Sequence, residues 1–362
     1  MLSCGLIGLP LVGKTTLYNL LTKSAQETSS FFTGKTEAHK GIAMIPDARI
    51  DFLSGIYKPR KTIYAQLEVV DLVGLVKGAS EGQGVGNAYL SQARNVDSLV
   101  HVVRVFNNPD VPHPEGKIDP LRDIETINLE LLFSDLDMVE KRIERIEAGK
   151  KKADQAKELS ILGRIRDALH NEKTVHSLDL TDEESAYIRS FALFTEKPMI
   201  LVVNIDEEQL RAKDYPHQEA LRQYAGEKSM PLLEICAQAE LEISQLEPGD
   251  QEEFMLDLGI AESGISLLAR SIYHHLKLIS FFTVGEDEVR AWTIDEGITA
   301  RAAAGKIHSD LERGFIRAEV IKYSDLHELG NITRVKEKGL FRLEGKEYIV
   351  VDGDIMSIRF NV

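Results

Sequence analysis

The sequence contains little cysteine and no long hydrophobic run. Its 362 residues include 2 Cys, and no apolar stretch reaches the roughly 20 residues that a membrane-spanning helix needs. Two cysteines, Cys4 and Cys236, support neither a disulfide framework nor a zinc site, and each follows or lies in an apolar stretch. We therefore expect a cytoplasmic protein with buried thiols and no membrane partner.

The chain also lacks an excess of positive charge. It has 43 Lys and Arg against 58 Asp and Glu, which gives a net charge of -15. Because nucleic-acid phosphates attract a positive surface, this balance argues against unspecific nucleic-acid binding, and we expect no sequence-specific DNA partner. Any RNA contact must be local. The length predicts two or three domains in a soluble globular chain.

The strongest local pattern is Gly-Leu-Pro-Leu-Val-Gly-Lys-Thr at residues 8–15, which we call the P-loop. It stands between an apolar run and a helical stretch, so backbone N–H groups and a helix N-terminus point at one small volume that favours a triphosphate. Lys14 would bind the β- and γ-phosphates, and the Thr15 hydroxyl would bind Mg²⁺. The residues predicted to hold the phosphates are Gly8, Leu11, Val12, Gly13, Lys14, Thr15 and Thr16.

A second pattern, Asp71-Leu72-Val73-Gly74, follows the next apolar strand. Asp71 would hold Mg²⁺ through water, and the Gly74 amide would contact the γ-phosphate, so Gly74 joins Lys14 among the predicted catalytic groups. Leu75 stands where Ras-like enzymes carry the glutamine that orients the attacking water. An aliphatic side chain cannot orient water, so we expect slow hydrolysis unless another residue takes this role.

Base selection is predicted at Asn204-Ile205-Asp206-Glu207. A guanine-specific site would read Asn-Lys-x-Asp, whereas here Ile205 replaces the lysine and the longer Glu207 replaces the aspartate that accepts from guanine. We therefore predict ATP, with ADP as product, over GTP. A GTPase and a non-catalytic scaffold with a structural nucleotide remain alternatives. Cys236, which ends another predicted strand, and Ala237, which follows it, complete the predicted nucleotide-binding residues.

The remaining pattern predicts an α/β fold with a doubly wound, mostly parallel sheet. From Leu129 to Ile146, and again from Ala156 to Leu169, apolar residues recur every three or four positions, which predicts two long helices that fold back as an antiparallel coiled-coil hairpin. Two ordinary surface helices are the alternative. The last section predicts a β-rich domain without a catalytic cluster. Its expected elements are strands at 280–284, 290–294, 316–321, 348–351 and 355–362 and a helix at 302–313.

Together these segments resemble the YchF/Ola family of Obg-related P-loop NTPases over essentially the whole chain. The resemblance rests on the P-loop, on DLVGLVKGASEGQGVGN at 71–87, on HVVR at 101–104, and on VRAWTI, AGKIHSDLERGFI and GKEYIVVDGD near the C-terminus. It implies a slow Mg²⁺-dependent ATPase that associates with ribosomes, through ribosomal RNA or protein. It also implies an inserted helical domain and a C-terminal TGS domain of the β-grasp type. The expected domains are 1–125 with 190–278, 126–189, and 279–362.

The resemblance also suggests functions for residues that the local patterns leave open. A histidine in a flexible loop takes part in hydrolysis in that family, and its setting corresponds to His113 here; the alternative is a solvated loop residue between Pro112 and Pro114. In the first switch, Thr36 is the predicted metal ligand, with Thr33 as the alternative. Leu11 replaces an asparagine that related enzymes use to hold a monovalent cation, so potassium dependence is not expected to carry over directly.

Overall fold

The computed structural model describes residues 2–26, 39–72, 90, 92–149 and 155–361. The chain divides into two compact units. The first, which carries the P-loop, comprises Leu2–Ile42 and Glu68–Leu268, and the second comprises Ala43–Leu67 and Ala269–Val362. We call them the P-loop unit and the C-terminal unit.

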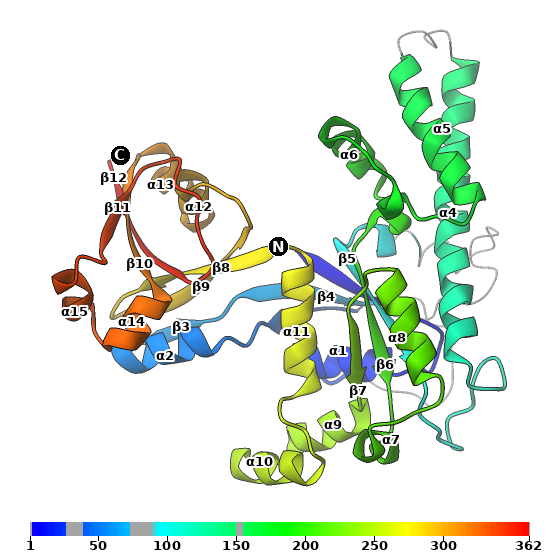
Figure 1. Ribbon diagram of the computed structural model, residues 1–362, viewed down its shortest axis with the longest axis horizontal. Helices are drawn as coiled ribbons and strands as arrows, with labels where there is room; N and C mark the ends of the chain where they lie inside the picture. Colours follow the sequence, from blue (N-terminus) through cyan, green and yellow to red (C-terminus); the bar gives the residue numbers. More distant parts are fainter. Residues whose placement is uncertain (1, 27–38, 73–89, 91, 150–154, 362) are drawn as a thin grey trace. The chain divides into compact units, whose positions relative to one another are not determined.

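The first sheet has six strands in the order β2-β4-β1-β5-β6-β7 (Figure 1). From β4 onward every neighbouring pair is parallel. The strands are β1 Ser3–Ile7, β2 His39–Met44, β4 Gln66–Asp71, β5 Ser98–Arg104, β6 Met199–Asn204 and β7 Leu232–Ile235. This arrangement confirms the predicted fold class.

The order of these strands determines where a ligand can approach. Every residue of β1 and β5 is buried, as expected for parallel strands that are covered on both faces. The chain continues from β1 to β4 on one side of β1 and later to β5 on the other side. The carboxyl end of β1 therefore lies at a topological switch point, which is where open α/β sheets bind ligands.

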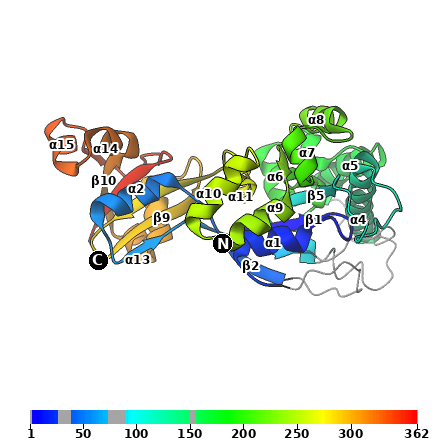
Figure 2. The ribbon, with the colours of Figure 1, turned by 90° about the horizontal axis from the view of Figure 1, so that it is seen from below.

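Helices pack beside the strands of the first sheet (Figure 1). α1 and α9 pack against each other and lie side by side (Figure 2). α11 continues from the P-loop unit into the C-terminal unit. The helices are α1 Lys14–Thr22, α7 Glu207–Ala212, α8 Gln218–Glu227, α9 Ala237–Gln245, α10 Pro248–Asp257 and α11 Gly264–His275.

The helical hairpin consists of α4, Pro120–Ala148, and α5, Ala156–His170. Asp119 caps α4 by accepting from the Arg122 N–H, and Pro120 occupies its first turn, where a missing N–H costs nothing. The two helices pack against each other in an antiparallel pair (Figure 1). The predicted hairpin is therefore confirmed, although α4 begins before residue 126. Shorter helices follow at Val175–Ser177, Asp182–Ile188 (α6), Arg189–Phe191 and Phe194–Glu196.

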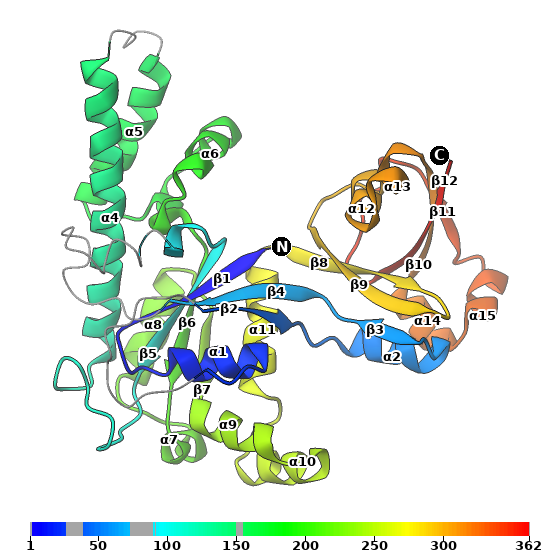
Figure 3. The same ribbon diagram turned by 180° about the vertical axis from the view of Figure 1, so that it is seen from behind.

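The C-terminal unit contains a mixed six-stranded sheet in the order β11-β10-β12-β8-β9-β3. α12 and α13 lie over one face, and α2 and α14 lie over the other (Figure 3). Its strands are β3 Lys61–Ile63, β8 Leu278–Val284, β9 Glu288–Asp295, β10 Phe315–Lys322, β11 Arg342–Glu344 and β12 Asp354–Phe360. Its helices are α2 Ala48–Tyr57, α12 Ala300–Ile307, α13 Ser309–Arg313, α14 Tyr323–Leu329 and α15 Ile332–Glu337.

Two elements of this unit differ from the sequence-based expectation. The single helix expected at 302–313 is divided, because His308 has extended backbone (φ -162) and its side chain caps α13. The strand expected at 348–351 is reduced to an isolated bridge between Thr299 and Ile349. Within the described ranges, no helix combines the length and the apolar character that a membrane crossing requires.

The division of the chain also differs from the expected boundaries. Residues 43–67 were expected in the nucleotide-binding domain, but they belong to the C-terminal unit. Their strand β3 pairs in parallel with β9, and their helix α2 packs on β8 and β9. Because β3 and α2 complete a sheet whose other strands lie more than 200 residues further along the chain, no local pattern indicates this placement.

Candidate functional site

The P-loop connects the carboxyl end of β1 to the N-terminus of α1. Gly8 has φ 141 and Gly13, the N-cap of α1, has φ 101, a region that side chains with a Cβ rarely adopt. A Cβ on Gly8 would lie 2.3 Å from the Val102 carbonyl oxygen, and a Cβ on Gly13 would lie 2.3 Å from Asn204 Nδ2. Both glycines are therefore required by backbone conformation and by close packing.

Leu11 adopts a left-handed backbone conformation within the loop, with φ 63. This conformation costs a non-glycine residue about 1–2 kcal/mol, and asparagine tolerates it better than leucine does. An asparagine at this position would therefore suit the backbone better than leucine does. In this chain the loop keeps the conformation with an aliphatic side chain.

Lys14 is buried, with 6% of its surface exposed. Its Nζ donates to the loop's own carbonyl oxygens, at 3.0 Å for Gly8 and 2.7 Å for Leu9. Burial lowers the pKa of Lys14 to about 8, and the nearby Asp71 charge partly opposes this shift. Two neutral carbonyls are weak partners for a buried cation, so phosphate oxygens at this place would be stronger ones.

The predicted metal-side pair is in contact. The Thr15 hydroxyl donates to Asp71 Oδ2 at 2.8 Å, and Asp71 ends strand β4. Asp71 is fully buried, and its Oδ1 has no hydrogen-bond partner among the described residues. A buried carboxylate oxygen without a partner is costly unless a donor or a cation satisfies it. A hydroxyl and a carboxylate are hard oxygen ligands, so these two residues fit Mg²⁺.

Two predicted site residues lie outside the described residues. These are Gly74, the expected contact of the γ-phosphate, and Thr36, the expected metal ligand of the first switch; Thr33 lies in the same segment. Their roles stay predictions.

Asn204 links the P-loop to the end of β7. Its Nδ2 donates to the Val12 carbonyl oxygen at 2.9 Å, and its Oδ1 accepts from the Ala237 N–H at 3.1 Å. The same Nδ2 is the group that excludes a Cβ at Gly13. Asn204 therefore sets the shape of the P-loop, and it also fixes Ala237 at the start of α9.

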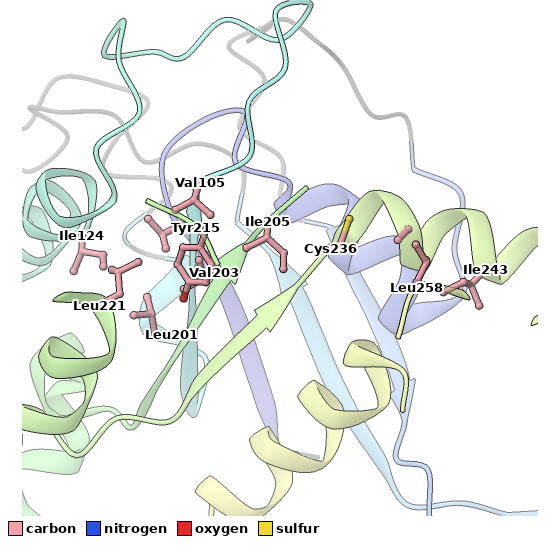
Figure 4. Close-up of a cluster of buried hydrophobic side chains, with 12 residues drawn as sticks. Val105, Ile124, Leu201, Val203, Ile205, Tyr215, Leu221, Cys236, Ile243 and Leu258 are labelled. Atoms are coloured by element: carbon pink, nitrogen blue, oxygen red, sulfur yellow. The ribbon is translucent and has the colours of Figure 1, made fainter. Parts of the chain in front are cut away.

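The residues after Asn204 separate into a core residue and two acids. Ile205 is buried in a hydrophobic cluster that includes Cys236, and the two residues lie at neighbouring strand ends (Figure 4). Asp206 caps α7 in a capping box with Gln209. This cap follows from the spacing of Asp206 and Gln209, and sequence reasoning missed it. The third residue, Glu207, is half-buried, and its carboxylate is not part of this cap.

Glu207 and Cys236 lie close enough to interact. Burial raises the pKa of the Cys236 thiol to about 11, and the Glu207 carboxylate adds to this rise. The thiol is therefore neutral and inert at physiological pH. Of the two acids after Ile205, Glu207 is the one whose carboxylate is not engaged in the helix cap.

Two buried polar residues of β5 were noticed in the sequence only as part of a family pattern. His101 is 1% exposed, and burial, aided by the Lys14 charge, lowers its pKa to about 3, so its imidazole is neutral. Arg104 donates to the carbonyl oxygens of Phe106, Asn108 and Val111. The sequence does contain a signal for both residues, because a histidine and an arginine flank Val102-Val103 in an otherwise apolar strand.

His113 is not a solvated loop residue. Its side chain is 3% exposed and faces Asp123 of α4, with Nε2 3.0 Å from Asp123 Oδ2. The solvated alternative is therefore wrong. Its role in hydrolysis stays a prediction.

Comparison with known proteins covers the whole chain. A family model described as a 50S ribosome-binding GTPase matches residues 3–139, and a YchF-GTPase C-terminal model, described as a protein of unknown function, matches residues 278–361. A protein of Bacillus subtilis named ribosome-binding ATPase YchF is 42% identical over 100% of both chains. Its namesake in Haemophilus influenzae is 44% identical over 99% of both.

A solved structure is also similar over almost the whole length. The Schizosaccharomyces pombe YchF GTPase has 32% sequence identity and a TM-score of 0.86, and the match covers 99% of this chain and 97% of that one. The fold described above therefore recurs in a relative of clearly detectable sequence similarity.

Proposed function

The chain belongs to the YchF family, and from this premise we propose that it is a Mg²⁺-dependent ATPase that hydrolyses ATP slowly and acts as a nucleotide-operated switch. The observation that supports this proposal is the convergence of Lys14, Thr15 and Asp71 at the carboxyl end of β1, beneath a loop that only glycine permits. Within the described residues the buried Lys14 ammonium donates to two neutral carbonyls, which are weaker partners than phosphate oxygens would be.

The proposed mechanism assigns a physical role to each residue. Lys14 Nζ would exchange the carbonyls of Gly8 and Leu9 for phosphate oxygens, a stronger, charge-assisted interaction. Thr15 Oγ1 and Asp71 would hold Mg²⁺, which neutralises charge on the β- and γ-phosphates when bound. The Gly74 amide would contact the γ-phosphate. Leu75, the residue after Gly74, is aliphatic and cannot orient the attacking water. His113 is therefore the proposed group that orients this water.

ATP is proposed over GTP because of Glu207. It occupies the position at which a guanine reader carries an aspartate, one methylene shorter, and Ile205 packs into the core instead of supplying a lysine. The neighbouring Asp206 cannot substitute without giving up its cap on α7. A site that lacks well-placed acceptors has no basis for preferring guanine.

Calorimetric titration with ATP, ADP and GTP tests the base choice and the P-loop together. ATP is expected to bind at least about tenfold more tightly than GTP, equivalent to 1.4 kcal/mol. Lys14→Ala should abolish binding, whereas Lys228→Ala, which removes an exposed lysine of the same unit, should leave it unchanged. A tenfold preference for GTP would contradict the reading of Glu207.

A GTPase is the second candidate function. It is favoured by one observation: the similar solved structure and the N-terminal family model both carry the description GTPase. Phosphate release that is unaffected by Lys14→Ala or Asp71→Ala would instead indicate a scaffold with a structural nucleotide.

We propose the ribosome as the partner and the cytoplasm as the location, because the curated relatives are named ribosome-binding. In this proposal, residues 126–189 form the inserted helical domain and the C-terminal unit is the TGS-like domain. Cosedimentation with ribosomes in the presence of a non-hydrolysable ATP analogue, ADP or no nucleotide tests the switch. Equal binding in all three states would contradict it.

A further inference from the structure

His113 lies in the segment that connects β5 to α4, and each of its ring nitrogens lies close to a polar atom of the protein. Nδ1 accepts from the Glu115 N–H at 3.2 Å, and Nε2 lies 3.0 Å from Asp123 Oδ2. Because Nδ1 accepts, the ring is deprotonated there and carries its proton on Nε2, the nitrogen nearer to the Asp123 carboxylate. In this arrangement Nδ1 is occupied by the Glu115 N–H, and Nε2 is buried against Asp123.

The Asp123 carboxylate is held in place by its own helix, α4. Arg122 donates to Asp123 Oδ1 from Nε at 3.0 Å and from Nη2 at 2.7 Å. Asp123 also stands in the first turn of α4, where the helix dipole favours a negative charge. Burial raises the pKa of Asp123, and the Arg122 guanidinium opposes this rise. The carboxylate is therefore a stationary feature of α4, and the histidine belongs to the connecting segment.

The first residues of the segment between β5 and α4 are held by a different residue, Arg104. Arg104, at the end of β5, donates to three backbone carbonyls between Phe106 and Val111, and its guanidinium lies 4.2 Å from the centre of the Phe106 ring. These contacts fix residues 106–111. Together with Asp123 they define the position of His113 from both ends of the connection.

The contact between His113 and Asp123 is well suited to release. The 3.0 Å separation of Nε2 and Oδ2 fits a hydrogen bond, but the direction of the N–H does not, and within the described residues neither atom makes one. Two buried polar atoms that are close but poorly aligned keep an electrostatic attraction and still bear part of their desolvation cost. Burial lowers the pKa of His113, which keeps the ring neutral. The other charged groups that face it are Arg104 and Arg122.

We propose that Asp123 is a positioning residue that holds His113 in a parked arrangement, and that hydrolysis requires His113 to leave Asp123. This inference rests on the proposed role of His113 in hydrolysis. In the parked arrangement Nδ1 accepts from the Glu115 N–H and Nε2 is buried against Asp123, so the resting rate depends on how often this contact opens.

Single-turnover hydrolysis of ATP tests the parked arrangement. Asp123→Asn keeps the size of the side chain and can still accept from Arg122, but it removes the negative charge that faces Nε2. The rate is expected to rise by about three- to tenfold, the range for loss of one modest contact, with the Kd for ATP unchanged. Asp110→Asn, an exposed aspartate of the same segment, is the matched control and should change neither value.

A double variant separates the failure of this inference from the failure of the proposed function. If His113 orients the water, His113→Gln lowers the rate, and Asp123→Asn added to His113→Gln has no further effect. An Asp123→Asn enzyme that stays folded and hydrolyses ATP at the wild-type rate or more slowly would overturn the parked arrangement. An unchanged rate in His113→Gln would instead contradict the proposed role of His113.

A measurement on the unmodified chain needs no variant. Long-range ¹H–¹⁵N NMR spectra of the imidazole rings should show His113 as the neutral Nε2–H tautomer without nucleotide. Addition of a non-hydrolysable ATP analogue with Mg²⁺ should shift its nitrogen resonances, whereas ADP should leave them near the starting values. Identical spectra in all three states would overturn the proposal even if Asp123→Asn failed to fold.

Discussion

Lys14 illustrates how much of the site depends on one buried side chain. Among the described residues, the Lys14 ammonium donates to the carbonyls of Gly8 and Leu9, and at longer range the Asp71 charge acts on it. The Lys14 ammonium is thus held within the loop by weak partners, and a bound anion would stabilise its charge more strongly.

The lowered pKa of Lys14, about 8, predicts a pH dependence of ATP affinity. Phosphate raises the pKa of a bound ammonium, so binding includes proton uptake wherever the free lysine is neutral. Affinity should therefore be nearly constant below pH 7 and should fall by up to about tenfold per unit as pH rises above 8.

Calorimetry between pH 6.5 and 9.5 measures this dependence. Titrations at pH 8.5 in two buffers of different ionisation enthalpy should also show proton uptake on binding of ATP. Equal Kd values at pH 7 and pH 9 would mean that Lys14 stays protonated without nucleotide. The terminal phosphate, with a pKa of about 6, has already ionised in this range and does not confuse the result.

Single residues were predictable where their neighbours in the chain explain them. Gly13, Lys14 and Thr15 follow from a local pattern. The need for Gly13 to lack a Cβ arises equally from Asn204, which lies in a distant strand. His113 and Asp123 are ten residues apart in the sequence, but an irregular segment separates them, and no periodicity predicts that one is buried against the other.

At the scale of elements, the helical hairpin has a hydrophobic core of its own. The cluster that includes Val139, Ile143, Leu162 and Ile165 contains only residues between 132 and 193. Arg142 and Glu158 add an ion pair of 2.6 Å between the two helices. We infer that the hairpin can loosen without disturbing the P-loop.

Leu162→Ala should weaken the hairpin selectively. Leu162 is fully buried, and such a truncation costs about 2–5 kcal/mol. Hydrogen exchange should accelerate in α5 and in the second half of α4, with the affinity for ATP unchanged. Lys157→Ala, an exposed position on the same helix, should have little effect. A parallel loss of ATP binding would show that the hairpin and the P-loop unfold together.

At the scale of the molecule, the chain passes into the C-terminal unit between β2 and β4 and returns to the first sheet. Within the C-terminal unit, Arg49 of α2 donates to Asp352 at 2.7 Å and lies over the Phe282 ring at 5.2 Å. Asp352 in turn accepts from the Ser280 N–H. The segment 43–67 therefore forms part of the structure of this unit.

Arg49→Ala should destabilise the C-terminal unit by roughly 1–3 kcal/mol, because it removes bonds to two carboxylates and leaves them without their partner. Arg60→Ala is the matched control in the same segment. Its ion pair with Asp287 has side-chain exposures of 84% and 86%, and such pairs contribute little. Hydrogen exchange of β8 and β9 measures both. An equal effect of the two substitutions would contradict the role given to Arg49.

The sequence by itself determined the elements whose cause is local. The strand, loop and helix around Lys14, the apolar periodicity of α4 and α5, and the acid at the end of β4 depend on residues a few positions apart, so a linear pattern reveals them. The family resemblance extended this reading to the whole chain.

Only the tertiary structure decided which distant segments meet. It placed Asn204 against the P-loop, joined residues 43–67 to the C-terminal sheet, and buried His113 beside Asp123. Each of these contacts is formed because packing brings together surfaces that are complementary in three dimensions. Residue spacing does not encode that complementarity, since segments without a shared period can pair in many ways and only the folded chain selects one.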